Sequence, residues 1–168
     1  LVEDFGGYYP AQDLWSEEFV PGETLERHAR RLARNPQDAE RLRQMWPFFV
    51  WSSLTAYVDF WNRTGRKQEI LDASLANVVV PADDFHTGAR IVSISARRPH
   101  QGLLAMIRSF RDSFLAPAEE RHPLVRGLVG WDVILSSVLE VVGEKEGTEI
   151  LRKLLWQDEH EIPEDLHQ

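Results

Sequence analysis

The sequence predicts a mainly α-helical protein, a single-domain bundle of about six or seven helices. Apolar residues recur at helical spacing over most of the chain, and proline and glycine separate the periodic stretches. A length of 168 residues is that of one domain. We therefore treat residues 1–168 as one helical domain. Within it we expect an irregular, aromatic-rich N-terminal segment over residues 1–21 and an acidic C-terminal tail over residues 158–168.

The first half of the chain carries the most apolar predicted helix. A short basic helix is expected over Thr24–Arg34, and Pro36 suits the first position of the next helix. Pro47 is expected to break or kink that second helix. From Phe48 to Trp61 apolar residues occur on nearly every face, and the main stripe falls at positions 46, 50, 54, 57 and 61. A helix of this kind is normally central to the core.

The middle of the chain has two interpretations. A short helix is expected over Lys67–Ala76. Residues 78–80 and 90–95 are rich in β-branched side chains and could pair as a short two-stranded β element. Phe85, Ala89, Val92 and Ala96 instead lie at helical spacing. We favour a helix over 83–96 and keep the β element as the alternative.

The second half is predicted to be helical again. One apolar face predicts a helix after Pro99 that ends near Leu115, and a second, very regular pattern predicts a helix over Leu124–Val142. Gly127 and Gly130 lie inside this second pattern, where we expect another backbone to approach closely. Gly143 is expected to cap the helix, and 148–156 to form a last amphipathic helix.

Composition excludes several kinds of chemistry. The chain has no cysteine, which excludes disulfides, cysteine-based zinc sites, iron–sulfur clusters and cysteine nucleophiles. The longest apolar stretch, residues 47–61, is shorter than the roughly 20 residues that span a bilayer. Residues 1–4 also lack the basic start and apolar run of a signal peptide. We therefore expect a cytoplasmic protein that does not bind a membrane.

The net charge of −8 disfavours nucleic acid as a partner, because phosphate binding depends on clustered lysine and arginine. One basic cluster is present, with four arginines and His28 between Arg27 and Arg34. We interpret this cluster as the solvated face of a surface helix.

Two short acid-acid-x-His clusters resemble each other. The stretch PADDFH at residues 81–86 is echoed by PAEERH at residues 117–122. Asp83 with His86, or Glu119 with His122, would share a helix face and could ligate zinc, manganese or non-haem iron. The interpretation that we favour is helix-end chemistry, because proline followed by acids is typical of a helix N-terminus. No cofactor is strongly implied.

Two aspartates inside apolar helices are the candidates for a ligand-binding pocket. Asp59 and Asp132 are flanked by large apolar residues, and Trp51 and Trp131 lie nearby in the sequence. A buried carboxylate must be paired or must shift its pKa upward, and a raised pKa marks functional sites. The simpler interpretation is that each aspartate lies at a helix edge or meets an arginine such as Arg63 or Arg126.

The common phosphate-binding, serine-hydrolase and metalloprotease motifs are missing from the sequence. We therefore lean away from an enzyme and expect a protein-interaction or regulatory module that binds another protein or itself. The six tryptophans and the acidic surface suit a basic or apolar partner. The alternatives are a small-molecule-binding protein or enzyme with an aromatic-lined pocket, and a metal-dependent enzyme that uses the acid-acid-x-His clusters.

Overall fold

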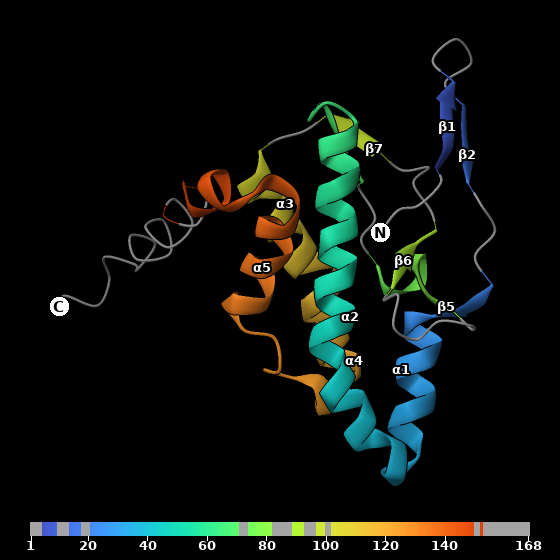
Figure 1. The fold of residues 1–168 in the computed structure, drawn as a ribbon. Coiled ribbons are helices and arrows are strands. Elements are labelled where there is room, and N and C mark those ends of the chain that lie inside the picture. Colours follow the sequence, from blue (N-terminus) through green and yellow to red (C-terminus); the bar gives the residue numbers. More distant parts are fainter. Residues whose placement is uncertain are drawn as a thin grey trace, which may run out of the picture.

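The computed structural model describes residues 5–9, 14–17, 21–70, 74–81, 89–92, 97–99, 102–149 and 152. The fold is mainly α-helical, as predicted (Figure 1). Five helices carry the labels α1 (Leu25–Arg34), α2 (Pro36–Arg63), α3 (Leu103–Phe110), α4 (Ala116–Arg121) and α5 (Trp131–Val142). Residues 144–149 are helical as well, so the last helical stretch begins before position 148.

Within the described residues, three small antiparallel sheets accompany the helices. Strand β3 (Gly22–Thr24) pairs with β5 (Val78–Pro81), which pairs with β6 (Arg90–Ile91). Strand β4 (Gln68–Ile70) pairs with β7 (Arg97–Pro99). The N-terminal segment was expected to be irregular, but β1 (Phe5–Tyr9) and β2 (Leu14–Glu17) form an antiparallel pair within it.

The middle of the chain follows the β alternative. Val78 pairs with Ile91 and Val79 pairs with Arg90, so the predicted helix over 83–96 is wrong at residues 89–92. Residues 82–88 and 93–96 lie outside the described residues. The predicted helix over 67–76 is also wrong at its described residues, because 68–70 form β4 and 75–76 belong to a 3-10 turn, η1 (Leu75–Asn77). Residues 71–73 lie outside the described residues. Strand pairing with distant segments outweighs the local helical spacing in both places.

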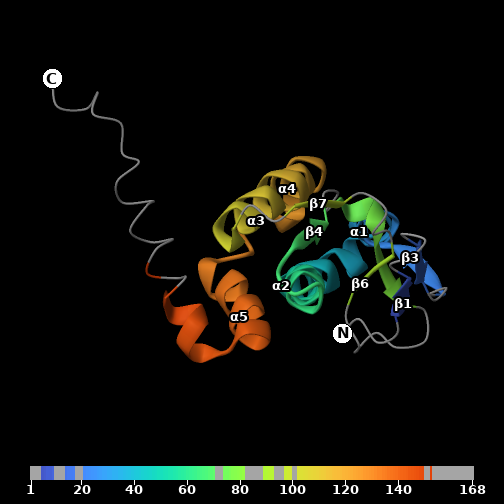
Figure 2. The ribbon, with the colours of Figure 1, turned by 90° about the horizontal axis from the view of Figure 1, so that it is seen from above.

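Helix α2 is the centre of the fold. Figure 2 shows α2 between α5 on one side and α1 with its strands on the other. The predicted stripe at 46, 50, 54, 57 and 61 is buried throughout. The helix is not interrupted at Pro47 and continues to Arg63, because the packing around both halves compensates for the missing backbone N–H.

The helix after Pro99 is longer than predicted. It does not end near Leu115 but passes through a π-helical turn, η2 (Arg111–Leu115), into α4. Ala116 N–H accordingly reaches back to the carbonyl of Arg111. Pro117 follows directly and has no N–H to donate, so the widened turn fits the proline into a continuous rod. Phe110 and Phe114 stack on each other in this rod, with ring centroids 4.6 Å apart.

Helix α5 begins at Trp131 rather than at Leu124. The residues before it form a 3-10 turn, η3 (Pro123–Val125), and then an irregular stretch. Gly127 has a φ of +71°, and a Cβ added to it would have no neighbouring atom within 4 Å, so it serves a turn and not the close backbone approach that we expected. Gly130 is the N-cap residue of α5, and Gly143 ends the helix with a φ of +82°, as predicted. Among the described helices, none is long and apolar enough to span a bilayer.

Candidate functional site

A groove between α2 and α5 that is partly open to solvent contains two of the predicted site residues. Trp51 and Asp59 both line it, and its volume is about 300 Å³. The other lining residues are Ser52, Thr55, Asn62 and Arg63 from α2, and Glu140 and Val141 from α5. We call this recess the α2–α5 groove.

The α2 side of the groove is one stripe of side chains. Trp51, Thr55, Asp59 and Arg63 follow each other at four-residue intervals, which places them on one helix face. The twelve residue steps from Trp51 to Arg63 extend over about 18 Å of α-helix, so the groove follows α2 for about three turns. Trp51 at one end is half-buried and stacks on Phe48, with the rings 6.0 Å apart.

The aspartate of the groove is paired, as the simpler interpretation expected. Asp59 Oδ2 accepts from Arg63 Nε at 2.8 Å, and the Asp59 side chain is 22% exposed. Glu140 contributes a second carboxylate from α5 and is exposed. Among the described residues no cation pairs with Glu140, so the groove carries one uncompensated negative charge.

Trp131 and Asp132 do not join Trp51 and Asp59. Trp131 lies in a second recess of about 230 Å³ between η2, α4 and the start of α5, and the Arg111 guanidinium lies 4.9 Å from its ring centroid. Asp132 is exposed in the first turn of α5, where a carboxylate suits the helix dipole. The two predicted pairs therefore belong to separate places on the molecule.

The acid-acid-x-His clusters do not form a metal centre in the described part of the chain, where no group of three histidine, aspartate or glutamate side chains could hold an ion. Glu119 accepts a hydrogen bond from the backbone N–H of Gly127 at 3.1 Å. His122 ends α4 in non-helical geometry, so the cluster lies at a helix C-terminus and not at the predicted N-terminus. Asp83 and His86 lie outside the described residues.

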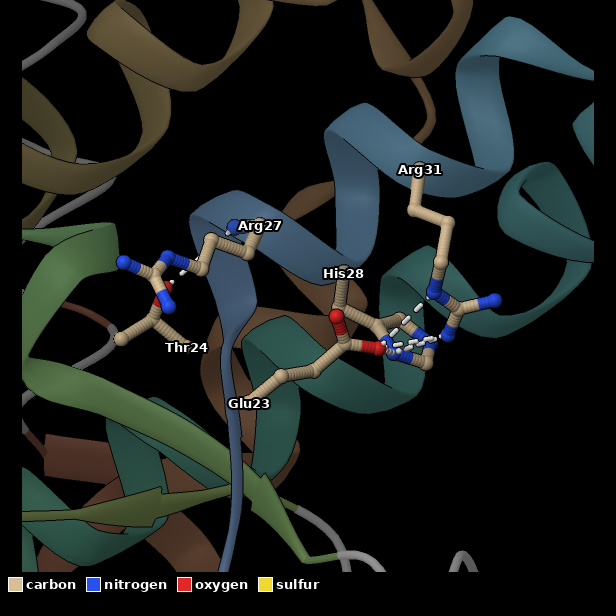
Figure 3. A network of polar contacts seen from close by, with 5 residues as sticks. All are labelled: Glu23, Thr24, Arg27, His28 and Arg31. Carbon is tan, nitrogen blue, oxygen red and sulfur yellow. Dashed lines mark hydrogen bonds and ion pairs between the residues drawn. The ribbon is translucent and has the colours of Figure 1, made fainter.

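A polar network on α1 was not predicted from the sequence. His28 is 3% exposed, and its Nδ1 lies 2.7 Å from Oε1 of Glu23 in β3 (Figure 3). Arg31 donates to the same oxygen through Nε at 3.1 Å and Nη2 at 2.5 Å. Because a carboxylate only accepts, Nδ1 of His28 carries the proton, and the Arg31–His28 approach of 3.1 Å is a contact between two donors.

Burial sets the charge state of this histidine. Desolvation lowers the pKa of His28, although the hydrogen bond from its ring to Glu23 acts in the opposite direction. The hydrogen bonds from Arg31 lower the pKa of Glu23. At neutral pH the network therefore consists of a carboxylate, a neutral imidazole and a guanidinium.

A second buried histidine, His122, lies near Glu26, the acidic residue in the first turn of α1. Burial lowers the pKa of His122, and the cations Arg30 and Arg121 lower it further, while Glu26 raises it. Arg30 and Arg121 both bond to Glu26, at 3.1 and 3.5 Å. Nε2 of His122 is buried and has no hydrogen-bond partner within the described residues. Helix α1 therefore takes part in two networks that each contain a buried histidine.

The sequence contained a signal for the burial of His28. Leu25, His28, Ala29 and Leu32 recur with the period of a helix, and all four are buried. That spacing places the histidine on the core face of α1 and leaves the four arginines on the solvated face.

Comparison with known proteins provides no functional information for this chain. No family model matches it, and no curated protein or solved structure is significantly similar to it. The function is therefore inferred from the residues and their geometry.

Proposed function

We propose that this protein is an interaction module that binds a segment of another protein in the α2–α5 groove. The observation that supports this proposal is the shape of the groove, which is partly open to solvent and is lined along about three turns of α2. A peptide that lies along two helices contacts an elongated surface of this kind. Proteins that bind compact small molecules usually enclose most of the ligand surface, whereas this groove is enclosed only in part.

The lining residues support a partner segment with two features. Trp51 is a half-buried, rigid aromatic surface, and such residues often anchor an apolar side chain in an interface. Glu140 lines the groove from α5 and forms no ion pair among the described residues. Its carboxylate therefore favours a lysine or arginine in the bound segment. The partner segment would therefore carry an apolar anchor and a basic residue.

The alternative functions have less support. A small-molecule site would use the same Trp51 and Asp59, but Asp59 is already paired with Arg63. A metal-dependent enzyme would need Glu119 and His122 to meet a further ligand, and Glu119 is engaged by the backbone of Gly127. A cytoplasmic location remains part of the proposal, in line with a chain that contains no cysteine.

A peptide-display experiment tests the groove directly. A library of random 16-residue peptides, about 24 Å long if helical, is selected on the wild-type protein, and the enriched peptides are measured against W51A and E140K. We expect at least about a tenfold loss of affinity for each variant, which corresponds to about 1.4 kcal/mol. E144K is the matched control, because Glu144 is exposed and lies outside the groove. Failure to enrich any peptide, or equal affinity for W51A, E140K and E144K, would refute the proposal.

A further inference from the structure

The exposed face of α1 consists of arginine. Arg27, Arg30, Arg31 and Arg34 are all exposed, and their spacing places them within one side of the helix, opposite the buried face that contains His28. Arg121 from α4 joins them, since it bonds to Glu26 at 3.5 Å and is 58% exposed. We call these five residues the arginine face.

Two carboxylates hold part of this face in position. Glu23 fixes Arg31 through two hydrogen bonds, and Glu26 bonds to both Arg30 and Arg121. Within the described part of the chain, neither Arg27 nor Arg34 has an ion-pair partner. The arginine face therefore has more guanidinium groups than carboxylates, although the chain as a whole is strongly acidic.

Arg27 and Arg34, which have no carboxylate partner among the described residues, are available to bind a carboxylate from outside the chain. Arginine suits this role because it presents a planar set of donors that matches a carboxylate. The contacts of Glu23 and Glu26 are examples of this recognition within the chain itself. The chemistry of the face thus favours an acidic peptide segment.

The chain contains a segment with that chemistry. Residues 158–168 include five acidic residues and no lysine or arginine. In Figures 1 and 2 the helix over 144–149, which leads toward this segment, lies on the opposite side of α2 from α1. Residues 158–168 themselves lie outside the described residues. Because the described helix that precedes them lies on the opposite side of α2 from the arginine face, we take a second copy of the protein as the source of the segment.

We propose that the arginine face of one copy binds the acidic segment 158–168 of a second copy. The contact is head-to-tail, because the two surfaces differ and belong to different parts of the chain. Nucleic acid is the less favoured occupant, since the net charge of −8 opposes the approach of a long polyanion. The proposed contact does not involve the α2–α5 groove, so it stands or fails independently of the proposed function.

Mixing two complementary variants tests this inference. The first, R27E/R34E, keeps the acidic segment and loses two unpaired cations of the face. The second replaces the five acids of residues 158–168 by Asn or Gln (D158N, E159Q, E161Q, E164Q and D165N) and keeps the face. We expect concentration-dependent self-association of the wild-type protein in sedimentation velocity, and a loss of at least about tenfold in affinity for each variant alone. An equimolar mixture of the two should restore a 1:1 complex, because one supplies the segment and the other the face.

Control variants separate this contact from a general effect of net charge. R126E/K145E changes the net charge by the same amount as R27E/R34E, at exposed positions outside the face, and should associate like the wild type. E140K in the groove should also leave the association unchanged. Raising the salt from about 50 to about 500 mM should weaken it, because exposed ion pairs are screened.

Three results would overturn the proposal: a wild-type protein that stays monomeric, variants that associate normally, or a mixture that forms no complex. A competition experiment distinguishes the two kinds of acidic occupant. Displacement of the acidic segment by a 20-base-pair DNA duplex, at a lower concentration than a peptide of residues 158–168 needs, would assign the face to nucleic acid instead.

Discussion

The carboxylate of Glu23 and the buried imidazole of His28 lie 2.7 Å apart at the junction between β3 and α1. Glu23 belongs to a strand in which it pairs with Val80 of β5, and His28 lies one turn into the helix that follows. The bond therefore joins the sheet to the buried face of α1. Because Arg31 donates to the same oxygen from the exposed face of the helix, one glutamate connects the core to the arginine face.

Removing the charge of Glu23 should destabilise the protein. E23Q keeps the side-chain volume, weakens the bond to His28 and removes the ion pair with Arg31. We expect a loss of about 1–2 kcal/mol in the free energy of unfolding, since the buried imidazole of His28 then donates to a neutral amide oxygen and Arg31 loses its charged partner. Urea unfolding followed by circular dichroism measures it. E40Q is the control, because Glu40 pairs with Arg43 on the surface and should contribute less than about 0.5 kcal/mol. Equal losses in both variants would contradict the role of Glu23 as the partner of the buried His28.

The two buried histidines predict that the protein loses stability in mild acid. The pKa of both His28 and His122 is lowered in the folded state, so the unfolded chain binds more protons at pH values below about 6.5. Stability should therefore rise with pH through this region and reach its full value above it. Glu23 acts at lower pH, because its pKa lies below the usual 4.5. Thermal unfolding between pH 5 and pH 8, about one and a half units on either side of the usual histidine pKa, measures the slope.

Replacing His122 isolates its share of this slope. In H122Q the side chain no longer titrates, so the dependence of the melting temperature on pH should be weaker than in the wild type. H28Q provides the comparison at the other buried histidine, and it should weaken the slope as well. An unchanged pH slope in H122Q would show that His122 does not gain a proton on unfolding.

Gly22 is required by the close approach of β3 to β5. A Cβ at this position would collide with the carbonyl oxygen of Val80 and with the side chain of Val79. Backbone cannot move aside as a flexible side chain can, so G22A should cost about 1–3 kcal/mol in unfolding free energy. G130A is the control, because its Cβ would meet only the side chain of Asp132, which can rotate away. If urea unfolding finds G22A as stable as G130A, the pairing of Gly22 with Pro81 is not as close as described.

Local signals in the sequence predicted the starts of α1 and α2 and much of the core, but not the start of α5. Thr24 caps α1 by accepting from the N–H of Arg27, and Pro36 begins α2, both in agreement with the residue types. The buried apolar stripe of α2 was also predicted correctly, because all of its residues belong to a single helix and recur at helical spacing. Several errors fall where a distant segment decides the structure. The β5–β6 pairing, which replaced a predicted helix, is of this kind.

In the candidate site, too, residues on one helix could be grouped from the sequence, whereas residues from distant segments could not. Trp51 and Asp59 lie two turns apart on one helix, so their common face followed from the sequence. Glu140 belongs to α5, far along the chain, and only the packing of α5 on α2 brings it to the groove. Glu23 was missed for a related reason, since its orientation depends on a distant strand partner, Val80.

Two adjacent serines on α5 offer a last, matched test of the α2–α5 packing. Ser137 is fully buried, and its hydroxyl lies 2.8 Å from the carbonyl of Val133 in its own helix and 3.2 Å from that of Trp51 in α2. Ser136 is exposed, and its hydroxyl donates within α5, to the same carbonyl of Val133 at 2.9 Å. We expect S137A to lower the free energy of unfolding by about 1 kcal/mol, because a buried hydrogen bond between two helices is lost. S136A should stay within about 0.5 kcal/mol of the wild type, as exposed substitutions usually do. Urea unfolding of both variants decides the matter, and a cost for S136A as large as that for S137A would mean that the hydroxyl of Ser137 does not tie α5 to α2.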